Sequence, residues 1–365
     1  MDSFFSGIYK NKKVFLTGHT GFKGSWMTLW LNKLGAEVYG YSLYPKYEPS
    51  HYELLGVKTS ETIDDIRNYE KLSSALKSFK PDMLIHMAAQ PLVRYSYREP
   101  RETFETNIMG TVNVLNACRE IDSIRAVINV TSDKCYENRE WVWGYRENDP
   151  MGGHDPYSSS KGCAELATSA FRNSFFNIDM FGKKHQTLIS SVRAGNVIGG
   201  GDWSDDRLIP DIVKAVSENE EVIIRSPESI RPWQHVLEPL SGYLMLGQKL
   251  LEGNKEFAGA WNFGPSDEES VSVHTVVDSI KKAWPKVKYR LQPDSNNPHE
   301  ANLLKLDCSK AYVKLKWKGI WDAENTFEKT AAWYREFYEN NRIISEEQLE
   351  DFFDEAIIKK VEWAH

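Results

Sequence analysis

Long apolar runs are absent from this chain of 365 residues. No segment approaches the stretch of about 20 hydrophobic residues that a membrane-spanning helix requires. The first 13 residues also lack the apolar core of a secretion signal. We therefore expect a protein without membrane contact that works in the cytoplasm.

Cysteine and surplus positive charge are scarce as well. The four cysteines show neither the paired spacing of a metal site nor a dense disulfide pattern, so we expect free thiols and no metal. Lys and Arg together number 45 against 52 Asp and Glu, a formal net charge of −7. Because nucleic-acid binding needs a basic face, this balance excludes a general affinity for DNA or RNA.

The first half of the chain alternates strand-like apolar runs with helical stretches. Such alternation predicts an α/β fold, a Rossmann-type doubly wound parallel sheet with helices on both faces. After Asn196 the pattern becomes irregular, which indicates a second, smaller α/β lobe. The predicted strands are 14–16, 37–43, 83–86, 126–130 and 186–192, and the predicted helices are 24–34, 69–79, 102–120 and one that begins near 157.

The expected domain boundaries follow from this change of pattern. We expect a first domain over residues 1–198, to which 233–253 returns, and a second lobe over 199–232 and 254–344. Residues 345–365 are predicted to be a helical tail with one apolar face. The tail packs either on the lobe or on a second subunit.

Three glycines stand between the first predicted strand and the first predicted helix. Gly18 permits a tight turn, Gly21 the close approach of a pyrophosphate, and Gly24 the packing of the helix on the strand. The bare N–H groups at the start of the helix attract phosphate. The spacing therefore predicts a bound nicotinamide dinucleotide. Other loop residues expected to contact it are Thr20, Phe22 and Lys23.

The adenosine end of this expected site is less defined. The strand at 37–43 ends without the carboxylate that usually binds the ribose, so the residues alone leave NAD and NADP open. Asp65 and Ile66, after the third strand, are candidates for an adenine contact. The alternative for Asp65 is the N-cap of a helix.

Three residues suited to hydride-transfer chemistry follow one another along the chain. Ser132 should close a strand, and Asp155 should cap the helix on which Tyr157 and Lys161 share one face. A lysine cation beside a phenol is expected to lower the pKa of the tyrosine toward neutrality. Tyr157 can then take the proton of an alcohol whose hydride passes to a nicotinamide, and Ser132 bonds the same oxygen.

Longer strings around these residues carry a family resemblance. The strings TGHTGFKGSW, HMAAQPLVR, TSDKCYENREWVWGYREN, DPYSSSKGCAEL, VRAGNVIGGGDW and RPWQHVLEPLSGY resemble the extended short-chain dehydrogenase/reductase family. Within that family they are similar to the CDP-sugar branch of the nucleotide-sugar 4,6-dehydratases, from about Lys12 to Trp317. The resemblance adds Ala88, Ala89, Gln90 and Asn107 to the expected cofactor contacts.

The resemblance implies a reaction in three steps on CDP-glucose, with NAD retained and redox-neutral over the cycle. Tyr157 takes the proton of the 4-hydroxyl as the hydride leaves carbon 4, water is then lost across carbons 5 and 6, and the hydride returns to carbon 6. The product, CDP-4-keto-6-deoxyglucose, belongs to 3,6-dideoxysugar synthesis. The resemblance also implies a homodimer or dimer of dimers, joined through residues 102–120 and the helix of Tyr157.

Asp133 and Lys134 extend the chemistry beyond hydride transfer. Related dehydratases carry Asp-Glu at these positions, where the aspartate protonates the departing hydroxyl and the glutamate is the base at carbon 5. Asp133 fits the first role if its pKa is raised enough for it to hold a proton. Lys134 departs from the wider pattern and matches the CDP branch. It is either the base, in neutral form, or a cation that stabilises the enolate.

The substrate contacts are expected in the second lobe. Arg231 suits a pyrophosphate because its guanidinium matches phosphate oxygens, and Asn196 should meet the sugar or a phosphate. Arg193 and His299 are further candidates, with a salt bridge or a packed loop as the alternative for each. The loop 135–154 either covers the site or packs on the lobe. Trp203 and Trp233 either stack on the base or belong to the core.

Two other functions compete with this interpretation. An epimerase or 4-ketoreductase of the same family needs neither an acid for a leaving hydroxyl nor a base at carbon 5, so Asp133 and Lys134 argue against it. A nucleotide-binding sensor would have no need of Ser132, Tyr157 and Lys161 together.

Overall fold

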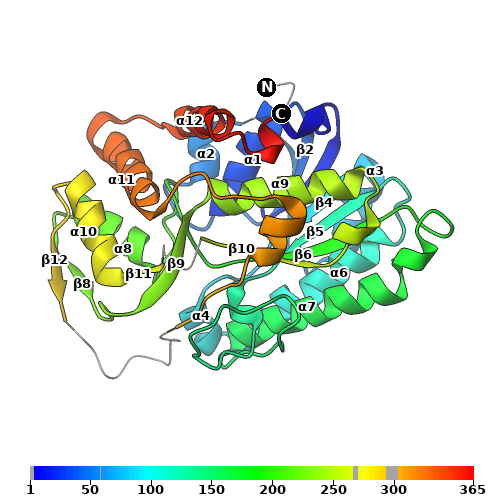
Figure 1. The fold of residues 1–365 in the computed structure, drawn as a ribbon, viewed down its shortest axis with the longest axis horizontal. Helices are drawn as coiled ribbons and strands as arrows, with labels where there is room; N and C mark the ends of the chain where they lie inside the picture. Colours follow the sequence, from blue (N-terminus) through cyan, green and yellow to red (C-terminus); the bar gives the residue numbers. More distant parts are fainter. Residues whose placement is uncertain (1–3, 58, 266–269, 293–302) are drawn as a thin grey trace.

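The centre of the molecule is a sheet of seven parallel strands (Figure 1). The structure is a computed structural model that describes residues 4–57, 59–265, 270–292 and 303–365. The strand order is β3-β2-β1-β4-β5-β6-β10, which confirms the predicted doubly wound fold. The strands are β1 (Lys13–Thr17), β2 (Glu37–Ser42), β3 (Ser60–Ile63), β4 (Met83–His86), β5 (Ala126–Val130), β6 (Leu188–Ala194) and β10 (Ala260–Phe263).

Helices cover both faces of the sheet because alternate strand residues point to opposite sides. Leu16 and Ile128 are buried in the core that includes α1 and α9. Phe15 and Val127, their neighbours in sequence, are buried in the core that includes α3 and α6. These helices are α1 (Phe22–Lys33), α3 (Tyr69–Phe79), α5 (Pro100–Phe104), a π-helical turn (Glu105–Met109), α6 (Gly110–Cys118), α7 (Pro156–Ser174) and α9 (Leu237–Leu251).

A smaller lobe lies beside the carboxyl ends of the strands, at the left of Figure 1. It contains a three-stranded sheet of β7 (Asn196–Ile198), β9 (Ile230–His235) and β11 (Ser270–Ser272), and a pair of β8 (Val222–Ile224) and β12 (Tyr289–Leu291). Its helices are α8 (Leu208–Ser217), α10 (Val273–Ala283) and α11 (Ala323–Asn340). Strand β9 was not predicted, because Pro232 lies within it and proline weakens a strand assignment.

The carboxyl-terminal helix α12 (Ser345–Ile358) joins the lobe to the first domain. Its Gln348 donates to the carbonyl of Lys329 in α11, at 2.7 Å, a contact with the lobe, which was one of the two alternatives. The rings of Phe353 and Trp30 are also in contact, with centroids 5.7 Å apart, so α12 packs on α1 as well. The contact with α1 was not predicted, because it depends on the aromatic side chain of Trp30 far away in the sequence.

Short elements connect these layers. They are α2 (His51–Leu55), α4 (Val93–Arg98), a π-helical turn (Ala311–Leu315) and 3-10 turns at Phe4–Gly7, Asp133–Cys135, Ile178–Met180, Lys255–Phe257 and Glu362–Ala364. The thiols of Cys118, Cys135, Cys163 and Cys308 are free. Among the described residues, no helix has the length and apolarity needed to cross a membrane, and no group of three acidic, His or Cys side chains is arranged to hold a metal.

Candidate active site

The glycine loop brings the start of α1 close to the end of β4. Gly18 has φ of 76°, and a Cβ atom there would lie 2.7 Å from the backbone nitrogen of Ala88. A Cβ atom on Gly24 would lie 2.0 Å from the carbonyl oxygen of Gly18. Gly21 caps α1 without a side-chain hydrogen bond, and no acidic residue lies in the first turn. The N–H groups of this turn are therefore open to an anion, so these residues fit a dinucleotide phosphate.

Asn107 fixes the loop after β4 to the helix that carries Tyr157. Its Oδ1 accepts from the backbone nitrogen of Gln90 at 2.8 Å, and its Nδ2 donates to the carbonyl of Gln90 at 3.0 Å. The same nitrogen donates to Ser160 Oγ on α7, at 2.8 Å. Both polar atoms of the amide are thus bonded within the protein. Asn107, expected as a cofactor contact, acts here by holding residues 88–92 in place.

At the adenosine end, the structure shows what stands in place of a carboxylate on β2. Thr20 Oγ1 lies 2.8 Å from Ser42 Oγ, at the end of that strand. His19 is buried, and its Nε2 lies 2.7 Å from Glu61 Oε2 on β3. A carboxylate from β3 therefore bonds to the glycine loop, which was not predicted from the sequence.

Asp65 is not a helix N-cap, so that alternative was wrong. The N-cap of α3 is Asn68, whose side chain accepts from the backbone nitrogen of Lys71. The carboxylate of Asp65 pairs with the guanidinium of Arg67 at 2.6 Å, and this pairing holds the pKa of Asp65 below its usual range. Ile66 is buried, and its side chain leaves no space for a Cβ atom on Gly110.

The elements that carry the expected catalytic residues form as predicted. Ser132 follows β5 and caps the turn Asp133–Cys135, accepting from the backbone nitrogen of Lys134 at 3.2 Å. Its hydroxyl donates to Asp133 Oδ1 at 3.0 Å. Helix α7 begins at Pro156, and the Asp155 side chain accepts from the backbone nitrogen of Ser158 at 2.9 Å. Strand end and helix start thus meet at the same edge of the sheet.

The pKa of Tyr157 is raised to about 12, chiefly by burial, so the expected lowering by Lys161 was wrong. Ser132 and the charge of Arg207 act in the opposite direction and lower this pKa. The ammonium of Lys161 is buried beside the carbonyl of Val130, at 3.5 Å, and burial lowers its own pKa to about 8. In the folded chain, desolvation outweighs the benefit of a cation one helical turn away.

Asp133 is a buried carboxyl whose pKa is raised by desolvation. The charges of Lys134, Lys23 and Arg231 and the hydroxyl of Ser132 oppose this rise without cancelling it. The direction of this shift suits a proton donor. Lys134 is half-buried and electrostatically coupled to the Asp133 carboxyl.

Arg193 does not reach the substrate region, so its assignment as a substrate contact was wrong. Its guanidinium pairs with Glu165 on α7 through two hydrogen bonds of 2.9 and 2.8 Å, and both side chains are buried. Its third nitrogen donates to the hydroxyl of Tyr136 and to the carbonyl of Glu147. The structure thus contains a salt bridge of Arg193, which was the alternative to a substrate contact.

The remaining substrate candidates take different places. Asn196 is half-buried at the start of β7, paired in register with Trp233 of β9. Arg231, also half-buried on β9, lies close enough to lower the pKa of Asp133. His299 lies outside the described residues. Trp233 is buried and Trp203 packs edge-on against Trp333 at 5.7 Å, as the core alternative required.

The loop 135–154 packs on the lobe, which was the second of its two alternatives. The rings of Tyr136 and Trp141 both stack on Tyr145, at 5.1 and 5.2 Å. Tyr145 also pairs through its backbone with Leu306.

Arg207 is a functional candidate that was not predicted from the sequence. It directly precedes α8, forms an ion pair with Asp202 at 3.2 Å, and its charge lowers the pKa of both Lys23 and Tyr157. The charge of Arg207 thus acts on both the glycine loop and Tyr157. The only sequence signal was an arginine between the glycine-rich segment 199–201 and the residues that form α8.

The fold and these side chains define a Rossmann-type enzyme that acts on nucleotide-linked substrates. The chain belongs to the GDP-mannose 4,6-dehydratase family, whose profile matches residues 15–330. It is 52% identical over 349 residues to the CDP-glucose 4,6-dehydratase of Salmonella typhimurium, covering 94% of this chain and 97% of that protein.

Solved structures of more distant proteins share the fold. A UDP-glucose 4-epimerase from Stenotrophomonas maltophila with bound NAD has a TM-score of 0.76 at 20% identity, covering 90% of this chain and all of that one. A UDP-glucose 4-epimerase from Thermus thermophilus in complex with NAD has a TM-score of 0.75 at 21% identity, covering 88% and 99%. At such identities the likeness shows the architecture alone.

Proposed function

We propose that this protein dehydrates CDP-D-glucose to CDP-4-keto-6-deoxy-D-glucose, as a hydro-lyase that keeps NAD through each cycle. The observation that carries the reaction class is a buried Asp133 with a raised pKa, directly beside Ser132 at the strand end that faces Tyr157. An acid at this place serves the loss of a hydroxyl, which an epimerase or ketoreductase does not need. The choice of CDP-glucose is supported by the Salmonella relative.

The glycine loop and residues 88–90 would hold the cofactor. The open N-terminus of α1 suits the cofactor's pyrophosphate. Gly18 lies so close to Ala88 that only backbone atoms form this part of the site. When bound, NAD would supply the hydride acceptor for carbon 4 and the hydride donor for carbon 6.

Oxidation at carbon 4 depends on Tyr157, Ser132 and Lys161. Tyr157 takes the proton of the 4-hydroxyl, and Ser132 orients that oxygen by a hydrogen bond. Arg207 supplies positive charge that stabilises the phenolate. Lys161, one helical turn after Tyr157, is assigned to hold the cofactor beside the reacting carbon. The ketone that results makes the proton on carbon 5 acidic, which prepares the next step.

Elimination depends on Asp133 and Lys134. Asp133 gives its proton to the hydroxyl that leaves carbon 6, so that water departs in place of hydroxide. We assign Lys134 as the base that takes the carbon-5 proton, acting in its neutral form. A charged Lys134 that stabilises the enolate is the rival role, and solvent exchange at carbon 5 separates the two.

The nucleotide diphosphate is expected between the lobe and the sheet. Arg231, with its planar guanidinium, suits the phosphate oxygens, and its effect on Asp133 supports a place close to the reacting sugar. Asn196 at the start of β7 would donate to the sugar or to a phosphate. His299 completes the proposed set of substrate contacts.

We also propose a homodimer or dimer of dimers that forms through α5–α6 and α7. These helices pack together, and Met109 and Leu166 are large apolar side chains that remain 50% and 59% exposed on them. Sedimentation of the wild type and of Leu166→Glu tests this: the variant should sediment as a lighter species. The free thiols support a reducing compartment, the cytoplasm.

Incubation with CDP-glucose deuterated at carbon 4, in ordinary water, tests the proposed reaction. Deuterium at carbon 6 of a 4-keto product is the expected result, because the hydride is shuttled within one molecule. Unchanged substrate, or turnover of dTDP- or GDP-glucose in its place, would contradict the assignment.

A further inference from the structure

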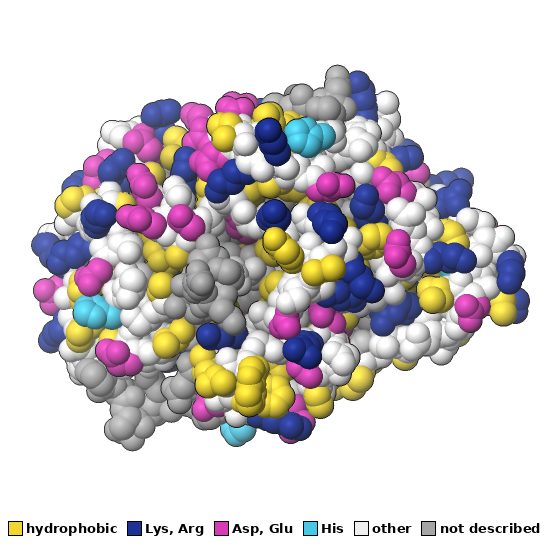
Figure 2. Space-filling view, in the orientation of Figure 1, with side chains coloured by type: hydrophobic (Ala, Val, Ile, Leu, Met, Phe, Trp, Pro, Cys, Tyr) yellow, Lys and Arg dark blue, Asp and Glu magenta, His cyan; other side chains and the backbone are white. Residues whose placement is uncertain are grey.

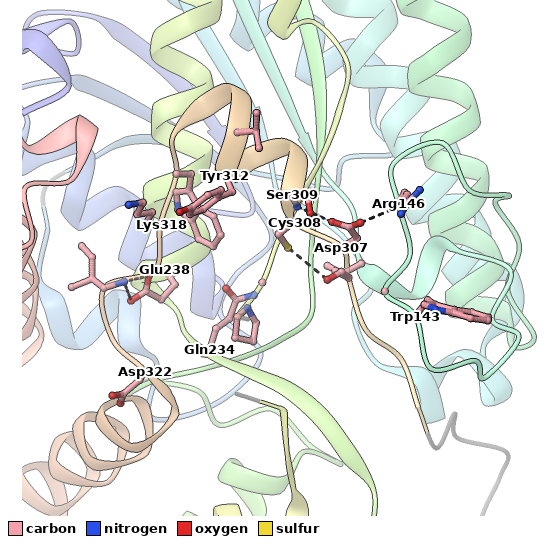
Figure 3. Close-up of a pocket in the computed structure, with 18 of the residues that line it drawn as sticks. Trp143, Arg146, Gln234, Glu238, Asp307, Cys308, Ser309, Tyr312, Lys318 and Asp322 are labelled. Atoms are coloured by element: carbon pink, nitrogen blue, oxygen red, sulfur yellow. Dashed lines mark hydrogen bonds and ion pairs between the residues drawn. The ribbon is translucent and has the colours of Figure 1, made fainter. Parts of the chain in front are cut away.

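A large cavity lies apart from the catalytic residues. Its volume is about 1000 Å³, and its lining comes from the loop 141–149, the start of α9 and the segment 306–322 (Figure 3). Ser132, Asp133, Tyr157 and Lys161 do not line it. A volume of this size accommodates a small organic ligand.

The wall of this cavity contains a buried hydrogen-bond acceptor without a donor. Gln234 is 3% exposed, and its Nε2 is fixed by donation to the carbonyl of Phe263 at 3.0 Å. Among the described residues, nothing donates to Gln234 Oε1, and nothing accepts from the indole nitrogen of Trp141, another lining residue. Because an unpaired buried polar atom costs free energy, these two atoms favour a ligand that both donates and accepts hydrogen bonds.

The charges around the cavity are balanced and already engaged. Three cations face four carboxylates: Arg146, Lys318 and Lys359 against Asp149, Glu238, Asp307 and Asp322. Arg146 pairs with Asp307 at 3.2 Å, and both oxygens of Glu238 accept from backbone nitrogens of the 320–321 turn. Lys359 donates to the carbonyl of Ile320. No surplus of positive charge is available for a phosphate, so the lining favours a neutral ligand over an anionic one.

Apolar side chains form the two rims of the cavity. Trp143 and Val142 on one loop are each 68% exposed, and Tyr312 and Val313 on the facing turn are 55% and 59% exposed. Figure 2 shows hydrophobic side chains over both segments, and Figure 3 shows Trp143 and Tyr312 on opposite sides of Cys308 and Asp307, with Gln234 on the side of Tyr312. Exposed aromatic residues beside engaged polar ones suit the apolar face of a hydroxylated ring.

We propose that this cavity is a second binding site, for a neutral sugar, which is separate from the catalytic cleft. The hydroxyl groups of a sugar can donate to Gln234 Oε1 and accept from the Trp141 indole, and its ring carbons can pack on Tyr312. The site goes beyond the proposed dehydration, because none of its residues takes part in that chemistry.

Saturation-transfer NMR with methyl α-D-glucopyranoside tests this site, in the presence of CDP at a concentration that fills the catalytic cleft. The expected result is saturation transfer to the sugar protons that persists in CDP. Gln234→Met should weaken this binding about tenfold, because the sugar loses one buried hydrogen bond. Tyr312→Ala, at an exposed position where folding is not at risk, should weaken it as well, and Phe175→Ala, an exposed aromatic position on the segment just after α7, should not.

Three results would overturn the proposal: no transfer to the sugar, transfer abolished by CDP, or transfer unchanged in the Gln234 and Tyr312 variants. If Gln234→Met does not fold, the exposed Tyr312→Ala decides the question. Turnover of CDP-glucose by Tyr312→Ala reports on the dehydratase function separately. Loss of sugar binding with turnover intact would therefore support the second site, and absence of turnover in the wild type would contradict only the proposed reaction.

Discussion

Replacing Asp133 by asparagine removes the proposed acid and keeps the local hydrogen bond. Ser132 Oγ donates to Asp133 Oδ1 at 3.0 Å, and an amide oxygen at the same place can accept it. The variant should therefore fold. General acid catalysis contributes about 10²- to 10⁴-fold, so turnover of CDP-glucose should fall by this factor, about 3–5 kcal/mol of the barrier. Oxidation at carbon 4 and exchange of the carbon-5 proton with solvent should continue.

The raised pKa of Asp133 also predicts how the substitution changes stability with pH. A carboxyl with a folded pKa above its unfolded value of about 3.9 favours folding only while it is protonated. This contribution is lost as pH rises from the unfolded pKa to the folded one. The amide of an asparagine side chain does not titrate. The Asp133→Asn variant should therefore be more thermostable than the wild type at neutral pH, and the difference should shrink in acid.

Two assays read out these effects: product formation with deuterium exchange at carbon 5 followed by mass spectrometry, and melting temperatures across pH. Turnover of Asp133→Asn within about threefold of the wild type would refute the acid role. Equal loss of oxidation, exchange and elimination would also refute it, because a group that acts only on the leaving hydroxyl cannot slow the first step.

Three further predictions concern the charged side chains of Lys134, Arg193 and Arg207. Lys134→Met should abolish exchange of the carbon-5 proton with solvent, measured by mass spectrometry, and exchange that persists would leave Lys134 only the stabilising role. Arg193→Leu strands the buried carboxylate of Glu165 and should lower the free energy of unfolding by about 3–5 kcal/mol in urea titrations, with most of it restored by adding Glu165→Leu. Arg207→Ala should raise the pKa of Tyr157 and shift the ascending limb of the pH–rate profile to higher pH, whereas Arg207→Lys should not.

Features set by neighbouring residues were predictable from the sequence. The strand at 83–86, the strand at 126–130 and the helix start at Asp155-Pro156 lie where the pattern predicted them. Each depends on alternation or capping within a few residues. The positive φ of Gly18, 76°, follows in the same way from the tight turn that the glycine spacing predicts.

Features set by distant parts of the chain were not predictable. Glu61 reaches the glycine loop only because β3 lies beside β2, and Arg207 reaches Tyr157 only because the lobe lies beside the sheet. The pKa of Tyr157 was misjudged for the same reason. A spacing of four residues places Lys161 on the right face of the helix, but burial by the rest of the fold decides the sign of the shift.

Asp133 and Tyr157 are coupled, and this coupling suggests an order for the proposed steps. The negative charge of Asp133 raises the pKa of Tyr157, so a protonated Asp133 makes the phenolate easier to form. Burial of both side chains then favours a site that carries one negative charge at a time. In the proposed reaction, a proton on Asp133 therefore helps Tyr157 to take the proton of the 4-hydroxyl. Once Tyr157 is protonated, Asp133 can release its proton to the leaving hydroxyl and become the charged member, beside Lys134, Lys23 and Arg231. The coupling of the two acids thus favours oxidation before elimination, the order that the acidity given by the ketone to carbon 5 requires.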